Sequence, residues 1–351
     1  MVGAMAQELR LSAGYLVNEQ SEKEIIDTVY FGGGTPSILD SAELSGLLQT
    51  VGACYRLSER AEITLEANPD DITTAKLRTW LDLGINRLSI GVQSFHGQDL
   101  QWMNRAHNDV QALASIGLAQ KAGFDNYSVD LIYGTPGLSD ERWKQHVDTV
   151  IGLGVPHLAC YALTVEPKTA LHKMIRLHKK TDIDSDRQAA QFLLLMQWLK
   201  AAGYEHYEIS NFSLSGFRSR HNSSYWKGIK YVGIGPSAHS FDGKKRRWNI
   251  SNNARYIQSL ADRVVPFEEE TLGPSALLNE YVMTALRTIE GIDLDLVEEK
   301  FSLTERTRIT AAADGLVGRG MIDFNGRAMV LTDEGKLFAD GIAADLFSVS
   351  G

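Results

Sequence analysis

The chain has 351 residues, 44% of them hydrophobic and 23% charged, so it can bury one large core or a large domain beside a small one. No apolar run approaches the roughly 18 residues of a membrane span, and no charged segment followed by an apolar one opens the chain as a signal peptide would. A net charge of −9 argues against nucleic acid as a partner, because such a partner favours a basic face. The two cysteines, Cys54 and Cys160, suit a reducing cytoplasm and exclude a cysteine-rich cluster motif within this chain. We therefore expect a cytoplasmic, enzyme-sized protein.

The first half of the chain alternates predicted strands and helices. After an opening helix over residues 4–16, the hydrophobic pattern predicts strands at 28–31, 62–67, 87–92, 127–132 and 157–161, with a sixth at 207–209, and helices near 41–52, 73–83 and 140–152. Such alternation is typical of repeated βα units on a parallel sheet. It predicts a barrel or partial barrel, and a doubly wound open sheet is the alternative. Both place chemistry at the carboxyl ends of the strands.

Polar or glycine residues stand where these strands end. They are Gly33, Gly34 and Thr35 after the first strand, Glu66 on the second, Gln93 on the third and Asp130 on the fourth. Each alone is compatible with a structural role, such as a turn, a cap or a bond to a backbone amide. Together, at the rim formed by the carboxyl ends of the strands, they indicate a binding site. Carboxylates that face the uncovered backbone N–H groups of glycines suit a ligand with hydroxyl and ammonium groups.

The next segment is rich in histidine and aromatic residues. It contains His206, then HNSSYW at residues 221–226 and GIGPSAHSF at residues 233–241. Imidazoles among aromatic side chains can ligate a metal or flank a flat macrocycle, and the alternative is core histidines bonded to the backbone. For His206 the core alternative is favoured, and for His221 both stay open. Asp242-Gly243 predicts a hairpin turn beside a short basic run at residues 244–247 that does not indicate RNA binding.

The last 80 residues predict a separate module. Helices are expected over 276–289 and 303–317, a hairpin over 321–331 turning at Asn325-Gly326, and a last helix from Thr332 to about 347. Helices followed by a hairpin indicate a small α+β, winged-helix-like domain. Because its charges are mainly acidic, we interpret it as a packing or partner module rather than a DNA-binding one.

Four motifs together are specific to a known family. Residues 31–37 (FGGGTPS), 66–69 (EANP), 89–95 (SIGVQSF) and 130–134 (DLIYG) resemble the radical S-adenosylmethionine (SAM) family of oxygen-independent coproporphyrinogen III oxidases. The motifs at 221–226 and 233–241 resemble the heme chaperone branch of that family. The resemblance covers nearly the whole chain. It implies a partial (β/α)6-type, TIM-like barrel with a radical SAM core at 1–170, barrel completion and a heme motif at 171–267, and the winged-helix-like domain at 268–351.

The resemblance also implies site residues. Gly33, Gly34 and Thr35 match positions that hold the methionine end of SAM, and four more match positions that contact its ribose, carboxylate and ammonium groups: Glu66, Gln93, Arg105 and Asp130. In the chaperone branch the HNSSYW motif is associated with heme, which makes His221, Tyr225 and Trp226 candidate heme-binding residues. The implied function is a heme chaperone that binds heme and SAM and delivers heme to an acceptor protein.

One departure from the family pattern is large. Family members carry a first strand and a Cys-x3-Cys-x2-Cys loop that binds a [4Fe–4S] cluster, whereas this sequence starts at the helix that follows that loop. Cys54 and Cys160 cannot replace it, because three thiolates must converge on one cluster. Truncation and a degenerate member without radical chemistry both explain this, and the retained SAM positions favour truncation. We expect no metal ligands and no catalytic turnover in the chain as written. A truncated coproporphyrinogen III oxidase and a non-catalytic scaffold are the alternative functions.

Overall fold

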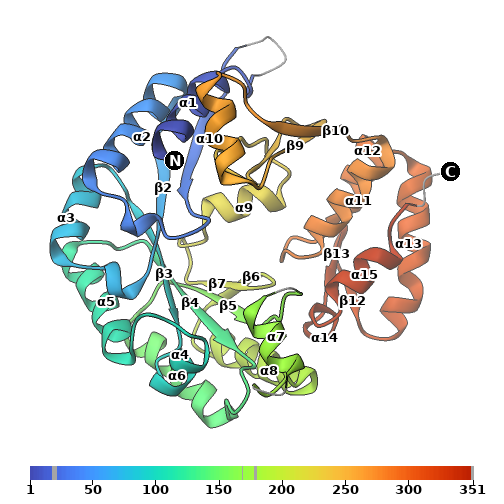
Figure 1. Ribbon diagram of the computed structural model, residues 1–351. Helices are drawn as coiled ribbons and strands as arrows, with labels where there is room; N and C mark the ends of the chain where they lie inside the picture. Colours follow the sequence, from blue (N-terminus) through green and yellow to red (C-terminus); the bar gives the residue numbers. More distant parts are fainter. Residues whose placement is uncertain (18–21, 168, 178–179, 349–351) are drawn as a thin grey trace.

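A seven-stranded sheet forms the centre of the computed structural model, which describes residues 1–17, 22–167, 169–177 and 180–348 (Figure 1). The strand order is β1-β2-β3-β4-β5-β7-β6, and neighbours from β1 to β5 run parallel. The strands are β1 (Ile25–Phe31), β2 (Arg56–Ala67), β3 (Arg87–Gln93), β4 (Tyr127–Tyr133), β5 (His157–Ala162), β6 (Glu205–Glu208) and β7 (Asn211–Ser213). The predicted parallel strands and partial barrel are confirmed.

The sixth predicted strand lies elsewhere than expected. It corresponds to β6, but the three-residue β7 lies between it and β5 and pairs antiparallel with both. β6 and β7 therefore close the sheet as a hairpin rather than as a further βα unit. A three-residue strand is too short to show a period-2 pattern, so the sequence contains no signal for it.

Helices cover the outer side of the sheet (Figure 1). They are α1 (Val2–Leu11), α2 (Ser41–Cys54), α3 (Thr74–Asp82), α5 (Asp109–Ala122), α6 (Asp140–Gly152) and α8 (Ser185–Ala201). The connections between strands and helices also contain the short helices α4 (Gly97–Trp102) and α7 (Ala170–Arg176) and two 3-10 turns, η1 (Pro36–Ile38) and η2 (Pro69–Asp71). Local sequence sets their ends: Asp40 and Glu43 form a capping box at α2, and Gly123 ends α5 in a left-handed conformation.

Successive residues of each strand point alternately to the hydrophobic core outside the sheet and to the candidate site inside it. Leu65, Leu88 and Leu158 are fully buried in the hydrophobic core that the strands share with the outer helices. Their neighbours in the chain point to the inner side of the sheet because successive strand residues face opposite sides. Glu66 and Ser89, which pair across β2 and β3, lie on that inner side. The sequence therefore builds a barrel with an apolar outside layer and a polar inside.

A second unit packs against β1 through α9 (Arg220–Trp226) and against α1 through α10 (Asn253–Ala261). It comprises these two helices and the antiparallel sheet of β8 (His239–Phe241), β9 (Lys245–Asn249) and β10 (Phe267–Thr271). The turn between β8 and β9 confirms the predicted hairpin at Asp242-Gly243. Its basic rim is partly exposed, as predicted, and is also ion-paired: Lys245 pairs with Glu269 at 2.7 Å and Arg246 with Glu270 at 3.8 Å across β10.

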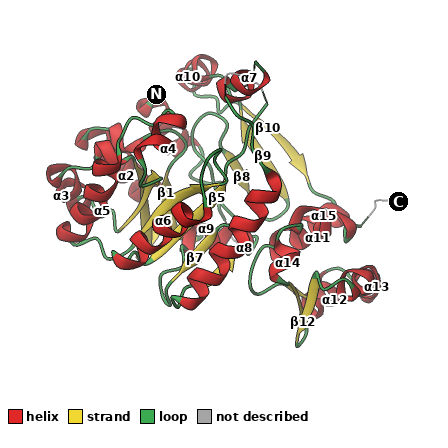
Figure 2. Ribbon diagram, turned by 90° about the horizontal axis from the view of Figure 1, so that it is seen from below, coloured by secondary structure: helices red, strands yellow, loops and turns green. Residues whose placement is uncertain are grey.

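The C-terminal module has the predicted winged-helix arrangement and lies beside the barrel (Figure 2). It comprises α11 (Pro274–Ala285), β11 (Ile292–Asp293), α12 (Leu294–Lys300), α13 (Leu303–Gly318), β12 (Ile322–Asn325), β13 (Ala328–Leu331), α14 (Asp333–Lys336) and α15 (Ala339–Asp345), with strand order β11-β13-β12. It contacts the barrel through α14 against α8 and through backbone bonds from Ile289 and Ile209 across the edge of β6.

Two details of this module differ from expectation. Asn325 pairs with Ala328, so the turn residues are Gly326 and Arg327 rather than Asn325 and Gly326. Gly326 has φ 62° and Arg327 does not have a positive φ, which fits a turn with glycine at its first central position. The single last helix is divided into α14 and α15, with Phe338 at the junction. Within the described residues, no helix is long and apolar enough to cross a membrane.

Gly335 gives a stability test of the C-terminal module. A Cβ at this position would lie 1.9 Å from the backbone oxygen of Met321, which cannot move without distorting the start of β12. We expect Gly335→Ala to lower the free energy of unfolding by about 1–3 kcal/mol. Gly341→Ala is the matched control, because a Cβ there meets nothing within 4 Å and alanine favours the helix. Urea unfolding of both variants checks this, and equal stability of the two would contradict the tight contact.

Candidate functional site

The rim begins where β1 runs into three glycines. Gly33 and Gly34 have φ values of 75° and 142°, a region that favours glycine, and a Cβ at either would meet nothing within 4 Å. Gly32 differs, because a Cβ there would lie 2.6 Å from both Glu66 Oε1 and Tyr30 Cε1. Gly33 and Gly34 are therefore favoured by their backbone conformation, and Gly32 is favoured because the side chains of Glu66 and Tyr30 lie too close for a Cβ. Because a Cβ at Gly33 or Gly34 would meet no atom, the loop leaves room for a ligand beside its backbone.

Glu66 connects the glycine loop to the inside of the barrel. Its Oε1 accepts a hydrogen bond from the Tyr30 hydroxyl at 2.8 Å, and its Oε2 accepts one from the Gly33 N–H at 3.2 Å. Burial and the Glu66 carboxylate raise the pKa of Tyr30, so its hydroxyl stays protonated and remains a donor. Thr35 follows as the residue before η1, at the edge of the same loop.

Gln93 ends β3 in an unusual backbone conformation. Its φ of 65° is in the left-handed region, which non-glycine residues seldom adopt. The next residue, Ser94, holds this turn, because its Oγ donates to Asp99 Oδ2 at 3.0 Å and lies 3.3 Å from His146 Nε2. All three of these supporting side chains are buried. A strained backbone conformation that buried neighbouring side chains hold in place is typical of functional positions.

Arg105 reaches the same edge from the loop after α4. Its Nη2 lies 3.4 Å from Asn68 Oδ1 and 3.4 Å from the backbone oxygen of Gly91, both long contacts. Burial lowers the pKa of Arg105, yet a guanidinium keeps its charge at any ordinary pH. The planar group is available to pair with a carboxylate. No strand pattern precedes Arg105, so only the family resemblance could indicate it.

Asp130 lies on the inner side of β4. Its Oδ1 accepts a hydrogen bond from Ser89 Oγ at 3.3 Å, and Ser128 Oγ donates to Ser89 at 2.9 Å. Burial, with a smaller contribution from the charge of Glu66, raises the pKa of Asp130 to about 7. The structure thus brings Glu66 and Asp130 within electrostatic reach of each other and of Arg105.

The pKa of Asp130 predicts a pH dependence of stability. Because its pKa in the folded state lies above its ordinary value of 3.8, the folded state binds more protons between about pH 4 and 7, and stability falls as the pH rises through that window. We expect Asp130→Asn to remove this loss, so that the wild type loses about 2 kcal/mol relative to the variant between pH 5 and pH 8. Urea unfolding of both proteins at the two pH values measures it. Parallel pH profiles would show that Asp130 titrates normally.

His221 lies inside the barrel, against β1. Its Nδ1 bonds to Thr28 Oγ1 at 2.8 Å, and its ring stacks on Tyr30 with centroids 4.7 Å apart and an interplanar angle of 19°. Burial lowers the pKa of His221 to about 4, so the imidazole is neutral near pH 7, as a metal ligand must be. Among the described residues, Nε2 has no hydrogen-bond partner. Tyr225 meets the ring edge-on at 5.1 Å and is 41% exposed.

The other aromatic and histidine positions divide between site and core. Trp226, the last residue of α9, has a buried indole Nε1 that finds no hydrogen-bond partner in the part of the chain that the structure describes. His206 is a core residue, as predicted: it stacks on Phe212 at 4.1 Å, and its Nε2 bonds to the backbone oxygen of Ile209 at 3.0 Å. The structure therefore places the 221–226 motif at the barrel interior and His206 outside it.

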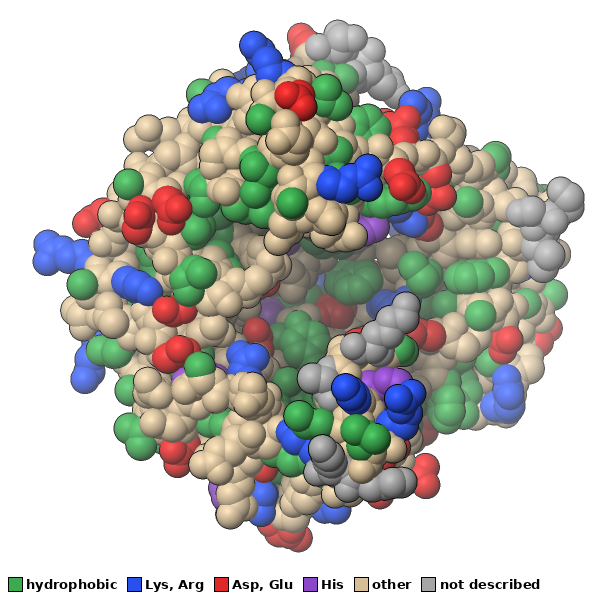
Figure 3. All heavy atoms as spheres, in the orientation of Figure 1, with side chains coloured by type: hydrophobic (Ala, Val, Ile, Leu, Met, Phe, Trp, Pro, Cys, Tyr) green, Lys and Arg blue, Asp and Glu red, His purple; other side chains and the backbone are tan. Residues whose placement is uncertain are grey.

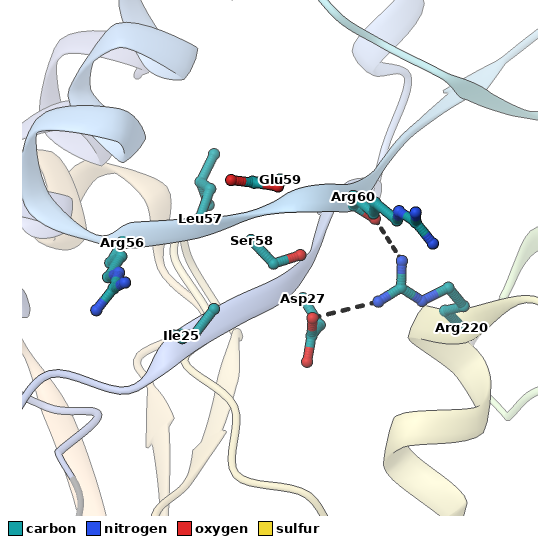
Figure 4. Close-up of a pocket in the computed structure, with 8 residues that line it drawn as sticks. All are labelled: Ile25, Asp27, Arg56, Leu57, Ser58, Glu59, Arg60 and Arg220. Carbon is teal, nitrogen blue, oxygen red and sulfur yellow. Dashed lines mark hydrogen bonds and ion pairs between the residues drawn. The ribbon is translucent and has the colours of Figure 1, made fainter.

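The start of α9 is fastened to β1 and β2. The buried Glu62 carboxylate accepts the backbone N–H groups of Arg220 at 3.2 Å and His221 at 3.0 Å. The Arg220 guanidinium donates to Asp27 at 3.2 Å and to the backbone oxygen of Arg60, where β2 bulges opposite β1 (Figure 4). The open pocket in Figure 4 lies at the amino ends of the strands, away from the glycine loop. We interpret it as the anchor of α9 rather than as the ligand site.

Several of these residues contact one another, and this face of the molecule is hollowed. Figure 3 shows a depression at the centre of this face of the molecule, with hydrophobic and acidic side chains in view. Contacts connect Gly33, Glu66, Tyr30 and His221 in one chain. Tyr30, Thr28 and Glu62 are additions that motif reasoning missed. Strand alternation was the available signal, because Thr28 and Tyr30 share one face of β1, and Glu62 shares a face of β2 with Glu66.

Cluster ligands cannot be assigned to this chain. Cys54 ends α2, Cys160 lies within β5, and both are buried and free. Across the described residues, no three His, Cys, Asp or Glu side chains are grouped so that they could hold a metal ion. The residues present therefore do not fit a [4Fe–4S] cluster.

Comparisons with known proteins agree with this geometry. A model of the Radical SAM superfamily matches residues 13–150, and a model of the HemN C-terminal domain matches residues 272–338. The heme chaperone HemW of Mycobacterium tuberculosis is 36% identical over 344 residues, covering 98% of this chain and 85% of the relative. HemW of Bacillus subtilis is 30% identical over 319 residues, covering 90% and 84%. The solved structure of Escherichia coli coproporphyrinogen III oxidase (HemN) has the same fold, with a TM-score of 0.82 at 20% identity over 99% of this chain and 82% of that one.

The fold and the matches with known proteins together define a protein of the radical SAM class. Within that class, the chain belongs to the family of the heme chaperone HemW.

Proposed function

We propose that this protein binds heme through His221 inside the barrel, binds SAM at the rim, and passes heme to an acceptor protein. The observation that carries the proposal is the state of His221. It is neutral, its Nδ1 is occupied by Thr28, and its Nε2 is left for a ligand bond. Fixing one ring nitrogen by a hydrogen bond orients the other, as in metal-ligating histidines generally. The name of the relatives, heme chaperone, supports the same assignment.

The residues around His221 suit a flat, largely apolar ligand. The exposed ring of Tyr225 offers a stacking surface, and the buried Nε1–H of Trp226 has no acceptor among the described residues. In this proposal His221 supplies the ligand nitrogen, while Tyr225 and Trp226 contact the macrocycle. Bound heme supplies an iron centre that accepts the imidazole.

The rim residues suit SAM. The N–H groups of Gly33 and Gly34 and the side chain of Thr35 would hold its methionine end. Glu66, Gln93 and Asp130 would accept from hydroxyl or ammonium groups, and Arg105 would pair with the carboxylate. When bound, SAM supplies a sulfonium centre. We assign no chemical step to it, because the cysteines of this chain do not fit the cluster that radical SAM proteins use.

Two binding measurements and one transfer measurement test the proposal. Hemin titration followed at the Soret band and calorimetry with SAM should each show one saturable site per chain. The hemin-loaded protein should then pass its heme to an apo-heme protein with a distinct spectrum, such as apomyoglobin, with a time course that differs from that of free hemin. Absence of hemin binding would overturn the heme assignment, and absence of heat with SAM would overturn the rim assignment.

A further inference from the structure

Tyr30 contacts both groups of candidate ligand residues. Its hydroxyl donates to Glu66 Oε1 at 2.8 Å, on the SAM side. Its ring stacks on the imidazole of His221 at 4.7 Å, on the heme side. No sequence motif or resemblance singled out this residue. Its position on β1, two residues after Thr28, directs it to the inner face of the sheet.

Both ends of Tyr30 are held in place. The Cε1 atom borders Gly32 so closely that a Cβ there would lie 2.6 Å away. The hydroxyl is anchored by Glu66, whose second oxygen is bound to the Gly33 N–H. The ring in turn supports His221, which Thr28 orients through Nδ1. The stacking of Tyr30 on His221 therefore depends on the hydrogen bond from Tyr30 to Glu66, which belongs to the candidate SAM site.

A ligand at the rim competes for this anchor. An acceptor of the ligand that takes the Gly33 N–H removes one of the two hydrogen bonds that hold Glu66, and hydroxyl or ammonium groups of the ligand then draw the carboxylate away from Tyr30. Tyr30 then loses its fixed acceptor, its ring is less ordered, and His221 loses part of its support. A ligand that changes the order of a second site changes the affinity of that site.

We propose that Tyr30 couples the two sites negatively: SAM at Glu66 lowers the affinity for heme at His221, and heme lowers the affinity for SAM by the same factor. The inference rests on the proposed function, since it requires both ligands to bind. Reciprocity follows from thermodynamic linkage. In a heme chaperone, such coupling makes occupation of the rim a signal to release heme.

Three proteins test the coupling: wild type, Tyr30→Phe and Tyr30→Leu. In the wild type, saturating SAM should raise the hemin dissociation constant about fivefold or more, and saturating hemin should raise that of SAM equally. Tyr30→Phe keeps the ring without its anchor, so SAM should change its hemin affinity by less than about twofold. Tyr30→Leu lacks the stack, so its hemin affinity without SAM should match that of SAM-saturated wild type. Tyr231→Phe is the control, because Tyr231 contacts Tyr225 and Phe241 but neither Glu66 nor His221, and it should retain the full effect.

The outcomes separate this inference from the proposed function. If hemin or SAM fails to bind the wild type, the proposed function is wrong and the coupling with it. If both bind and neither affects the other, the coupling alone is overturned. If Tyr30→Phe retains the wild-type effect, the two ligands interact without Tyr30, for example by direct contact, and the role of Tyr30 is wrong. Circular dichroism of each variant identifies a misfolded protein, and reciprocity in the wild type then remains as the test.

Discussion

Replacing Gly32 by alanine should weaken SAM binding at least tenfold while leaving the protein folded. A Cβ at this position would lie 2.6 Å from Glu66 Oε1 and from Tyr30 Cε1. The φ of Gly32 is not positive, so alanine fits the backbone and the conflict lies with two side chains that can move. Moving Glu66 breaks its bonds to Tyr30 and Gly33, and with them the arrangement of the rim. Calorimetry with SAM measures the loss, of which tenfold corresponds to about 1.4 kcal/mol.

Gly46→Ala is the matched control for this change. Gly46 lies in α2, where a Cβ meets nothing within 4 Å, so alanine there should leave SAM binding unchanged. Hemin binding by Gly32→Ala should fall as well, because Tyr30 supports His221. A Gly32→Ala protein that binds SAM as tightly as the wild type would show that the Glu66 carboxylate is not part of the SAM site.

Replacing Glu62 by leucine should destabilise the protein and remove most of its heme affinity. Glu62 is 4% exposed, and its carboxylate holds two backbone N–H groups at the start of α9, including that of His221. Leucine leaves both donors without their partner. It also removes a negative charge near Arg87, which is 1% exposed and whose pKa Glu62 helps to maintain. Losing one member of a buried charged group costs about 3–5 kcal/mol, which we expect in urea unfolding.

Two further variants show whether the carboxylate itself is required. Glu62→Gln keeps one acceptor oxygen, so its stability and hemin affinity should lie between those of wild type and Glu62→Leu. Glu59→Gln changes an exposed carboxylate three residues earlier on β2 and should be neutral in both measurements. If Glu62→Leu binds hemin like the wild type, the position of α9 does not depend on Glu62.

The sequence was sufficient for most of the barrel and for the rim. Short hydrophobic runs predicted β1 to β5, with polar and apolar residues alternating at 62–67. The strand ends predicted that Gly33, Glu66 and Asp130 lie on one edge, because parallel strands place their carboxyl ends together. The structure brings Gly33 and Glu66 into contact. Their roles with SAM stay predictions, as do the domain boundaries.

What the sequence could not show depends on contacts between distant segments. The support of His221 comes from Thr28, nearly 200 residues earlier, and nothing in the local pattern at 221–226 indicates it. The raised pKa of Asp130 arises from burial, which a strand pattern does not quantify. The turn at Gly326 was displaced by one residue because Asn-Gly and Gly-Arg both suit two-residue hairpins, and pairing of β12 with β13 decides between them.

The central claim is that His221 inside the barrel binds heme, and a hemin titration of three proteins tests it most directly. Wild type, His221→Ala and Ser224→Ala would be followed at the Soret band under identical conditions. Ser224 lies on the same helix, and its hydroxyl donates to the backbone oxygen of Arg220. We predict that His221→Ala shifts the Soret maximum and raises the dissociation constant at least tenfold, a loss of about 1.4 kcal/mol or more, while Ser224→Ala matches the wild type. A His221→Ala protein with the wild-type spectrum and affinity would remove His221 from the site and contradict the account.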